Sequence, residues 1–452
     1  MINFNFKFAL KPAIGENGIS YDDIKLLKEK LTDAKNNLDK LRKGGAIGLY
    51  DVPEDKQMIQ DIKNMAEIFF SKGIKTLFVF GMGGSSLGAI FLRNALNQTI
   101  NKTENKKMNV LFSENIDPAY LSSNLEKLNF EETLFCFVSK SGSTIEVVSQ
   151  FFIVKEKLEN KIKNKYKEHL MFITDKKSGF LRQFADDNNL SVLDIAANVG
   201  GRYSIITAGS LFPAYCMGLD IDKFLNGVIS ARDGILGRGP LDANPVYTAA
   251  SIIYLYYTKK NRNMFVINTY SDYLNEFGRW FRQLFAESLG KDLKSPTPIK
   301  AAGATDQHSQ LQLYMDGPQD KLSCFICLKD YGLDYNINSE GYEKYDYLNG
   351  KKLSELLLNE LNGVELALAM KGRPSFRITV DKIDEFTMGE LSFICMEMVP
   401  VLGNLLGINP FDQPGVEKVK KFAYLLMGRL DSSFASETEE LKRLEKIEDV
   451  EY

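Results

Sequence analysis

The sequence contains little of several residue types, and each scarcity narrows the possible functions. It has two histidines, one tryptophan and five cysteines in 452 residues, and the cysteines lack the spacing of a disulfide framework. Its net charge is only −3, which argues against a nucleic acid or an anionic membrane as the main partner. No apolar run approaches the roughly 20 residues that a membrane-spanning helix needs. The N-terminus alternates like a strand and lacks the apolar core of a signal peptide, so we expect a protein of the reducing cytoplasm.

What the sequence does contain is typical of a globular α/β protein. Hydrophobic residues make up 44% of the chain and charged residues 25%, and the length suggests two or three domains. Short apolar runs indicate strands that are buried on both faces of a parallel sheet. These runs cover residues 76–80, 109–112, 134–138, 170–173, 190–193, 264–269, 322–328 and 376–380. The helical patterns cover residues 21–43, 56–73, 246–260, 276–289, 353–372 and 386–407. Their alternation predicts doubly wound α/β domains with mainly parallel sheets.

The composition also predicts where the domains divide. Glycine and aspartate cluster in residues 219–244, so we expect the boundary between two domains (the seam) to lie in this region. We therefore predict an extended and helical segment at 1–44, a first α/β domain at 45–225, a second at 226–430, and a charged helical tail at 431–452. Cys324 and Cys327 have Cys-x-x-Cys spacing, but they lie in the apolar run LSCFICL, which favours a buried strand over metal or redox chemistry.

The helix predicted at 276–289 places one carboxylate at the border of the core. Its apolar stripe has helical spacing and consists of Phe277, Trp280, Phe281, Leu284 and Phe285. Gln283 and Glu287 are four residues apart, so they share a face beside that stripe. Gly290 is expected to end the helix in the left-handed conformation. Glu287 is therefore either a solvated surface acid or a partly buried general base whose pKa is raised by burial.

Two turns rich in glycine and serine follow predicted strands and precede helices. Such turns combine free backbone N–H groups with the positive end of a helix dipole, which suits a phosphate. The turn at 81–88 either binds an anion or only lets its helix pack closely. It is a poor dinucleotide fingerprint, because Ser86 stands where the third glycine belongs. The turn at 139–144 offers more hydroxyls than helix capping explains, so it predicts a phosphomonoester site. Both turns are expected at the edge where α/β sheets bind ligands.

Arginine, histidine and lysine supply the remaining candidates. Arg202 follows two glycines and is either a structural partner of carboxylates or a cation aimed at charge on a substrate oxygen. His308 lies at a predicted helix start and is an acid–base candidate, whereas His169 precedes a strand and is expected to face solvent. Pro414 suits the first turn of a last helix. Spacing does not choose among the basic residues of that helix, which are Lys418, Lys420, Lys421 and Arg429.

Six segments together resemble the glucose-6-phosphate isomerase (phosphoglucose isomerase) family in its short bacterial form. In chain order they read GMGGSSLG, SKSGST, NVGGRYS, FRQLFAESLGK, TDQHSQLQL and NPFDQPGVEKVK, and the resemblance runs from about Gly45 to Lys421. It implies two sugar-isomerase (SIS-type) domains, each a three-layer α/β/α arrangement with a mainly parallel sheet, plus helical terminal segments. It also implies a homodimer whose active sites are shared between the subunits.

The resemblance further implies a reaction and a role for each motif residue. The family interconverts glucose 6-phosphate and fructose 6-phosphate through a cis-enediol. This chemistry needs no metal or other cofactor, and no histidine, cysteine or aspartate cluster in the sequence has metal-ligand spacing. Carried onto this chain, Glu287 moves the proton and Arg202 stabilises the enediolate. His308 opens the sugar ring from the partner chain, and Lys420 assists ring opening or binds substrate. The substrate-binding residues would be Gly84, Ser85, Ser139, Lys140, Ser141, Ser143, Thr144, Gln283 and Gln413.

Three other functions stay open on the sequence. An isomerase acting on mannose 6-phosphate or on an amino-sugar phosphate would share these motifs. A phosphosugar-sensing module needs only the phosphate loops, so it is disfavoured by the presence of Glu287, Arg202, His308 and Lys420 together. A dinucleotide-dependent dehydrogenase is disfavoured by the poor glycine fingerprint.

Overall fold

The structure is a computed structural model that describes residues 2–238, 244–429, 431–444 and 447, and in this part of the chain the strands form two five-stranded sheets. The first sheet has the order β3-β2-β4-β5-β6 and is parallel throughout. Its strands are β2 (Thr76–Gly81), β3 (Asn109–Ser113), β4 (Thr133–Ser139), β5 (Leu170–Asp175) and β6 (Ser191–Ile195). The second sheet has the order β1-β10-β9-β7-β8, and only its edge strand β1 is antiparallel. Its strands are β1 (Ile2–Asn5), β7 (Met264–Thr269), β8 (Thr297–Ala302), β9 (Lys321–Leu328) and β10 (Ser375–Val380).

Helices cover both faces of the first sheet, because successive side chains of its strands point to opposite faces and nearly all are apolar. Phe78 and Phe80 face a core formed with α7, α8 and α9, whereas Leu77 and Val79 face a core formed with α4, α5 and α10. The helices of this domain are α4 (Lys56–Ser71), α5 (Leu87–Ala95), α6 (Asn97–Lys102), α7 (Pro118–Lys127), α8 (Ile145–Ile162), α9 (Phe180–Asp187) and α10 (Ala208–Cys216).

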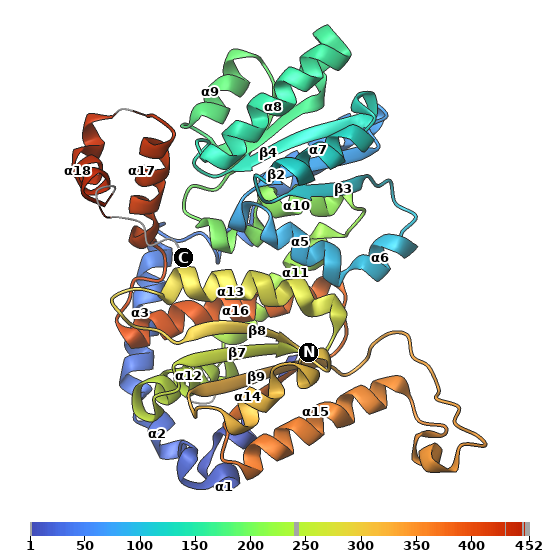
Figure 1. Cartoon of the computed structure of the whole chain (residues 1–452), viewed down its shortest axis with the longest axis vertical. Helices are drawn as coiled ribbons and strands as arrows, with labels where there is room; N and C mark the ends of the chain where they lie inside the picture. Colours follow the sequence, from blue (N-terminus) through green and yellow to red (C-terminus); the bar gives the residue numbers. More distant parts are fainter. Residues whose placement is uncertain (1, 239–243, 430, 445–446, 448–452) are drawn as a thin grey trace.

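The second sheet is also covered on both faces, and its inner face joins the core of the first domain. Phe265 and Ile267 belong to that shared core, while Val266 and Tyr270 face a smaller core under α14 and α15. Figure 1 shows α13 and α16 running between the two sheets. The helices here are α11 (Ile221–Leu236), α12 (Pro245–Lys260), α13 (Asn275–Leu289), α14 (Leu311–Asp316), α15 (Leu353–Met370) and α16 (Glu385–Leu406). The predicted class of two three-layer α/β units with mainly parallel sheets is confirmed.

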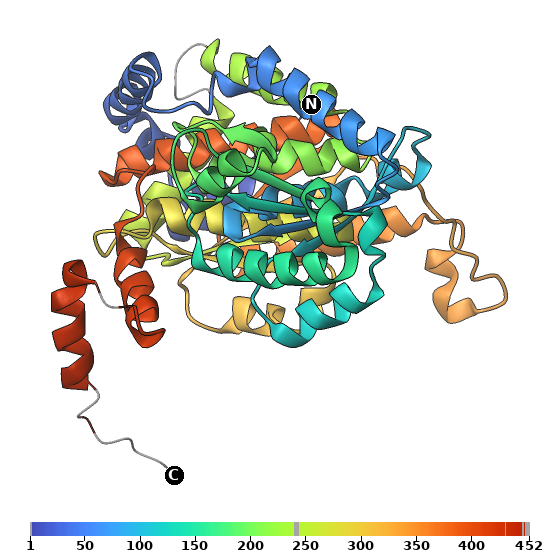
Figure 2. The same cartoon turned by 90° about the horizontal axis from the view of Figure 1, so that it is seen from above.

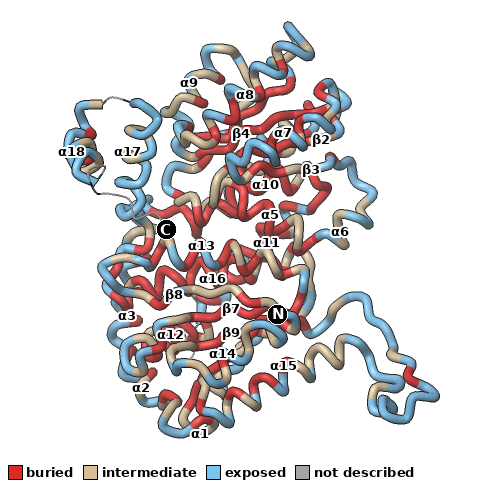
Figure 3. The backbone as a smooth tube through the Cα atoms, viewed as in Figure 1, coloured by how far each residue is buried: buried red, intermediate tan, exposed pale blue. Residues whose placement is uncertain are grey.

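The terminal segments are helical, as expected, but they do not form single long helices. The pattern at 21–43 divides into α2 (Tyr21–Lys25) and α3 (Lys28–Lys43), which follow the short α1 (Lys11–Ile14). The C-terminal helices α17 (Glu417–Leu426) and α18 (Ala435–Leu444) stand outside the body of the two domains (Figures 1 and 2). Figure 3 shows their surfaces mostly exposed. Of the predicted tail, residues 445–446 and 448–452 lie outside the described residues.

One strand was not predicted, and a helix lies within the predicted seam. Strand β8 was missed because Pro298 and Lys300 interrupt its apolar pattern, and both are tolerated because β8 is an edge strand. The predicted seam at 219–244 is largely occupied by α11, whose Gly227 packs so closely on α16 that a Cβ would lie 1.9 Å from Phe386 O. Residues 239–243 of that seam lie outside the described residues. The domain boundaries themselves stay a prediction.

Two further expectations are corrected by helices α13 and α16. Helix α13 ends at Leu289 as predicted, but Gly290 has φ −72° rather than a left-handed conformation. Glycine fits there because a Cβ would lie 2.8 Å from Ala286 O. Helix α16 has the length and composition of a membrane span, contrary to the expectation from apolar runs, yet most of it is buried between the two sheets. Cys324 and Cys327 are buried in β9, as predicted.

A buried carboxylic acid lies in the middle of α16. Glu397 accepts a hydrogen bond from Tyr50 Oη at 2.6 Å and another from Tyr247 Oη at 3.1 Å. Burial raises the pKa of Glu397 from 4.5 to about 6, and the two tyrosine hydroxyls lower it only in part. These three residues come from different elements of the shared core, so the stability of that core depends on pH.

The free energy of unfolding is expected to fall as the pH rises from 4.5 to about 6. Below 4.5 the carboxyl is protonated in both states, and above 6 the folded state must hold a desolvated charge, which costs about 2 kcal/mol. Glu397→Gln removes this loss, so its stability relative to wild type should rise through the same pH window. Urea unfolding at several pH values measures the difference, with the exposed Glu29→Gln as the control. A constant difference between pH 4 and 8 would contradict the expectation.

Candidate active site

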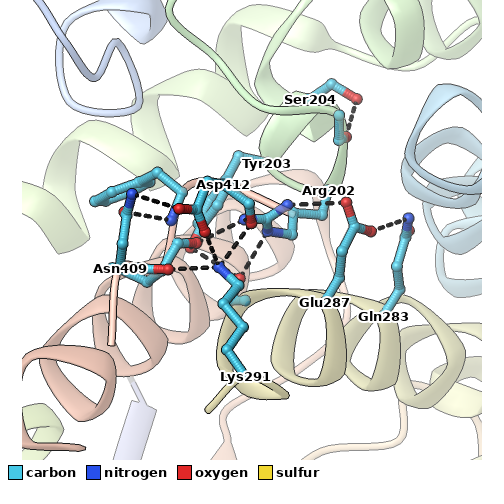
Figure 4. A network of polar contacts seen from close by, with 12 residues as sticks. Arg202, Tyr203, Ser204, Gln283, Glu287, Lys291, Asn409 and Asp412 are labelled. Atoms are coloured by element: carbon cyan, nitrogen blue, oxygen red, sulfur yellow. Dashed lines mark hydrogen bonds and ion pairs between the residues drawn. The ribbon is translucent and has the colours of Figure 1, made fainter. Parts of the chain in front are cut away.

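The predicted general base lies where the sequence placed it, in the last turn of α13 and partly buried. The Glu287 side chain is 23% exposed, and Arg202 Nη1 donates to its Oε1 at 2.8 Å. Gln283 Nε2, one turn earlier, donates to its Oε2 at 2.9 Å (Figure 4). The Gln283 Oε1 atom is buried and has no hydrogen-bond partner among the described residues. The carboxylate is thus held by two donors and is not a freely solvated acid.

Arg202 is fixed on every side. It lies on the 3₁₀ helix η7 (Gly201–Ile206) and its side chain is 2% exposed. Its Nε donates to Ser288 Oγ at 2.8 Å, and its Nη2 donates to Pro410 O at 2.7 Å and to Asp412 O at 2.9 Å. The sequence left open a structural partner of carboxylates or a cation aimed at charge on a substrate oxygen; the contact with Glu287 shows the first, and the second stays a prediction. A cation held this rigidly needs no reorganisation when negative charge develops beside it.

The first glycine-rich turn packs against the turn that carries Arg202. Gly84, on η4 (Gly83–Ser85), lies so close that a Cβ would be 2.1 Å from Gly201 O. Ser204 Oγ lies 2.6 Å from both carbonyl oxygens, of Gly84 and of Gly201. This contact joins two turns, so it does not decide whether the turn at 81–88 binds an anion or only lets its helix pack closely. Ser85 is partly exposed, and contacts of Gly84 and Ser85 with a sugar remain a prediction.

The second turn gathers its hydroxyls at the start of α8. Ser139 Oγ lies 2.8 Å from Thr144 Oγ1 and 3.5 Å from Ser141 Oγ, and Ser143 Oγ accepts from Phe180 N at 3.3 Å. Thr144 is the N-cap of α8 but makes no side-chain cap hydrogen bond. Because β2 and β4 are neighbours in the sheet, the two turns share one edge, as predicted.

Lys140, in the second turn, and Arg202 are two cations that lie close enough to affect each other. Burial lowers the pKa of the Lys140 ammonium and the Arg202 cation lowers it further, while Asp175 acts in the opposite direction. Two cations close enough to affect each other favour an anion between them. This arrangement supports the prediction that the second turn binds a phosphate.

Three predicted residues are not joined to this centre. His308 ends η10 (Thr305–His308), is exposed, and borders a separate cavity lined by Tyr273, Tyr331 and Leu357. Lys420 is exposed on α17, where its Nζ pairs with Glu417 Oε1 at 2.7 Å. Gln413 is exposed but directly follows Asp412, whose carbonyl binds Arg202. Within the described ranges, no hydrogen bond or ion pair links His308 or Lys420 to Glu287.

The expectation for His169 was wrong. This histidine is buried, and its Nδ1 donates to Thr133 O at 2.9 Å. It precedes β5, whereas the hydroxyl-rich turn follows the parallel neighbour β4, so the two lie at opposite edges of the sheet. A strand-flanking position did not reveal that the side chain is buried and bonded to the start of β4.

Several residues around Arg202 were not recognised as site residues in the sequence. Ser288 accepts from Arg202, and Tyr203 Oη lies 3.2 Å from Ser288 Oγ. Lys291 Nζ bonds Asn409 O and Asp412 on the segment that also binds Arg202. Each of these residues lies inside or next to one of the six family-like segments. Their nearness in sequence to Glu287, Arg202 or Gln413 was therefore the one feature that could have pointed to them.

Comparison with known proteins finds relatives along nearly the whole chain. The family model for phosphoglucose isomerase matches residues 50–317. A glucose-6-phosphate isomerase of Methanocaldococcus jannaschii is 35% identical over 94% of this chain and 100% of its own length. Another, from Carboxydothermus hydrogenoformans, is 33% identical over 98% of each chain.

Solved structures share the fold. A hypothetical protein from Thermus thermophilus superposes with a TM-score of 0.84 at 29% identity, covering 95% of this chain and 100% of its own. A glucose-6-phosphate isomerase from Chlamydia trachomatis has a TM-score of 0.73 at 23% identity, covering 85% of this chain and 76% of its own, which supports the fold alone. The match over more than half of the chain, together with relatives that align along nearly all of it, shows that this chain belongs to the phosphoglucose isomerase family.

Proposed function

We propose that this protein interconverts glucose 6-phosphate and fructose 6-phosphate, with Glu287 moving a proton between C2 and C1 through a cis-enediol. Membership of the family supports the reaction. The observation that carries the proposal is the Glu287 carboxylate held 2.8 Å from the buried Arg202 guanidinium, in a chain that also has a hydroxyl-rich turn at the start of α8. A base, a fixed cation and a phosphate anchor are what this isomerisation requires.

The remaining roles follow from where each side chain lies. Arg202 would stabilise the enediolate oxygen, because its position is fixed before charge develops. The phosphate would bind far from C1 and C2, so that its binding energy orients the reacting carbons. The residues proposed to hold it are Ser139, Lys140, Ser141, Ser143 and Thr144. Gly84, Ser85, Gln283 and Gln413 would line the sugar.

We further propose a cytoplasmic homodimer in which His308 of one chain opens the sugar ring in the site of the other. The exposure of His308 and its place on a cavity away from Glu287 support this assignment. The segment between β9 and α15 exposes Tyr335, Tyr342 and Tyr347 and extends from the body of the molecule (Figure 1). Exposed aromatic side chains of this number favour a protein interface. Lys420 would assist ring opening or bind substrate.

The direct test supplies fructose 6-phosphate with chelator present and detects glucose 6-phosphate through a coupled dehydrogenase. Rapid conversion is expected. Mannose 6-phosphate, tested in the reverse direction, separates this activity from that of an isomerase with a different sugar preference. A well-folded dimer that converts none of these sugars would overturn the proposal.

The double variant Ser141→Ala, Ser143→Ala is expected to raise KM by about 10–100-fold and to change kcat much less. Each lost hydroxyl removes a hydrogen bond to a charged phosphate, worth about 1.5–3 kcal/mol at most. The hydroxyls lie far from the proton transfer, so turnover of bound substrate should persist. Ser149→Ala is the control, since its hydroxyl only donates to Glu146 O within α8. A fall in kcat at unchanged KM would remove the phosphate assignment.

A further inference from the structure

The segment that orients Arg202 has no regular structure of its own. Residues 409–412 connect α16 to the 3₁₀ helix η12 (Pro414–Val416), and they contribute two of the four acceptors of the Arg202 guanidinium. Backbone outside helices and sheets keeps one conformation only where other contacts hold it. Whatever holds these four residues therefore also orients Arg202.

Lys291 makes the strongest of those contacts. Its Nζ lies 2.5 Å from Asn409 O, 2.6 Å from Asp412 O and 2.5 Å from Asp412 Oδ1, so all three ammonium hydrogens have an acceptor on this segment. The Lys291 side chain is only 11% exposed. Figure 4 shows it rising from the end of α13 to the segment that Arg202 reaches from the opposite direction.

The two cations meet on one oxygen. Asp412 O accepts from Lys291 Nζ at 2.6 Å and from Arg202 Nη2 at 2.9 Å. The other contacts within the segment are neutral donors. Asn409 Nδ2 donates to Asp412 Oδ2 at 3.0 Å, and Phe411 N donates to Asn409 Oδ1 at 3.1 Å. Without the ammonium, the half-exposed Asp412 carboxylate is free to turn to water, and the carbonyl that Arg202 uses would move with it.

We propose that Lys291 is a positioning residue for the isomerase reaction. It holds residues 409–412 so that the carbonyls of Pro410 and Asp412 fix Arg202 opposite Glu287. The proposal rests on the proposed function, and it assigns Lys291 no contact with substrate. Because Arg202 acts on charge in the transition state, a loss of its alignment lowers kcat. The phosphate turn belongs to the other sheet, so KM stays nearly unchanged.

The first experiment compares Lys291→Met with Lys294→Met. Both variants remove one lysine charge near the end of α13, but Lys294 Nζ donates to Leu406 O at the end of α16 and not to residues 409–412. We expect Lys291→Met to lower kcat by about 10–100-fold, as small misplacements in active sites do, with KM within about threefold of wild type. Lys294→Met should keep both constants. The proposal would be overturned if Lys291→Met kept the wild-type kcat, or if its only effect were a higher KM.

A chemical rescue separates positioning from a general folding defect. Lys291→Cys can be aminoethylated to give a side chain nearly isosteric with lysine, and the native cysteines are all buried and so protected. Aminoethylation, verified by mass spectrometry, should recover most of the lost kcat in the same folded preparation. Complete modification without recovery would contradict the proposal.

A readout independent of activity keeps this inference distinct from the proposed function. Hydrogen exchange of the peptide that contains residues 409–412 should accelerate in Lys291→Met and not in Lys294→Met. An inactive wild-type protein would remove the isomerase assignment while leaving this measurement intact. Unchanged exchange in Lys291→Met would show that the lysine does not anchor the segment.

Discussion

Glu287→Gln is expected to lower kcat by about 10²–10⁴-fold, the usual contribution of a positioned general base, in a protein that remains folded. The amide keeps the size of the carboxylate, and its oxygen can still accept from Arg202 Nη1. Gln283 now donates to the other carboxylate oxygen, and its own Oε1 has no partner in the described structure. Rotation of the Gln283 amide would therefore present an acceptor to the amide group introduced at position 287. The variant therefore changes the chemistry of the base while its contacts with Arg202 and Gln283 can be kept.

The matched control for this variant lies on the same helix. Glu276 is 25% exposed and pairs with Arg279 at 3.0 Å, so Glu276→Gln breaks a similar ion pair at similar burial. It should keep wild-type turnover. Binding of sorbitol 6-phosphate, which cannot isomerise, should be nearly unchanged in Glu287→Gln. Near wild-type turnover by Glu287→Gln would mean that Glu287 is not the base.

Mixing inactive Glu287→Gln chains with inactive His308→Ala chains is expected to restore activity. If each site combines Glu287 of one chain with His308 of the other, every mixed dimer contains one site with both native residues. Random pairing in a symmetric dimer makes half of the dimers mixed, so about a quarter of wild-type activity should return. Co-expression with two affinity tags and purification through both gives the mixed dimer directly.

A second mixture controls for nonspecific recovery. Glu287 and Arg202 are bonded within one chain, so mixed dimers of Glu287→Gln and Arg202→Met should have no intact site and stay inactive. No recovery in the first mixture, with the mixed dimer isolated, would show that each chain uses its own histidine. Recovery in both mixtures would contradict the assignment of Arg202 and Glu287 to one site.

Much of the fold was predictable because its signals are local. Strands β2, β4 and β9 are continuous apolar runs, since a parallel sheet buries both of their faces. Strand β8 was not predicted, because an edge position tolerates a proline and a lysine that a central strand would exclude. The burial of His169 likewise depends on segments that pack over it from elsewhere in the chain.

The sequence by itself determined the elements of the site: the face shared by Gln283 and Glu287, the hydroxyl-rich turn after β4, and the glycines before Arg202. Helical and strand periodicities fix these features over a few residues. Only the tertiary structure decided which of them meet. Arg202 bonds Glu287 from 85 positions away and Pro410 from 208 positions away, and the buried guanidinium must find all of its acceptors where distant segments pack. Lys291 holds the segment that carries two of those acceptors, and only the packing of that segment on the end of α13 reveals this contact.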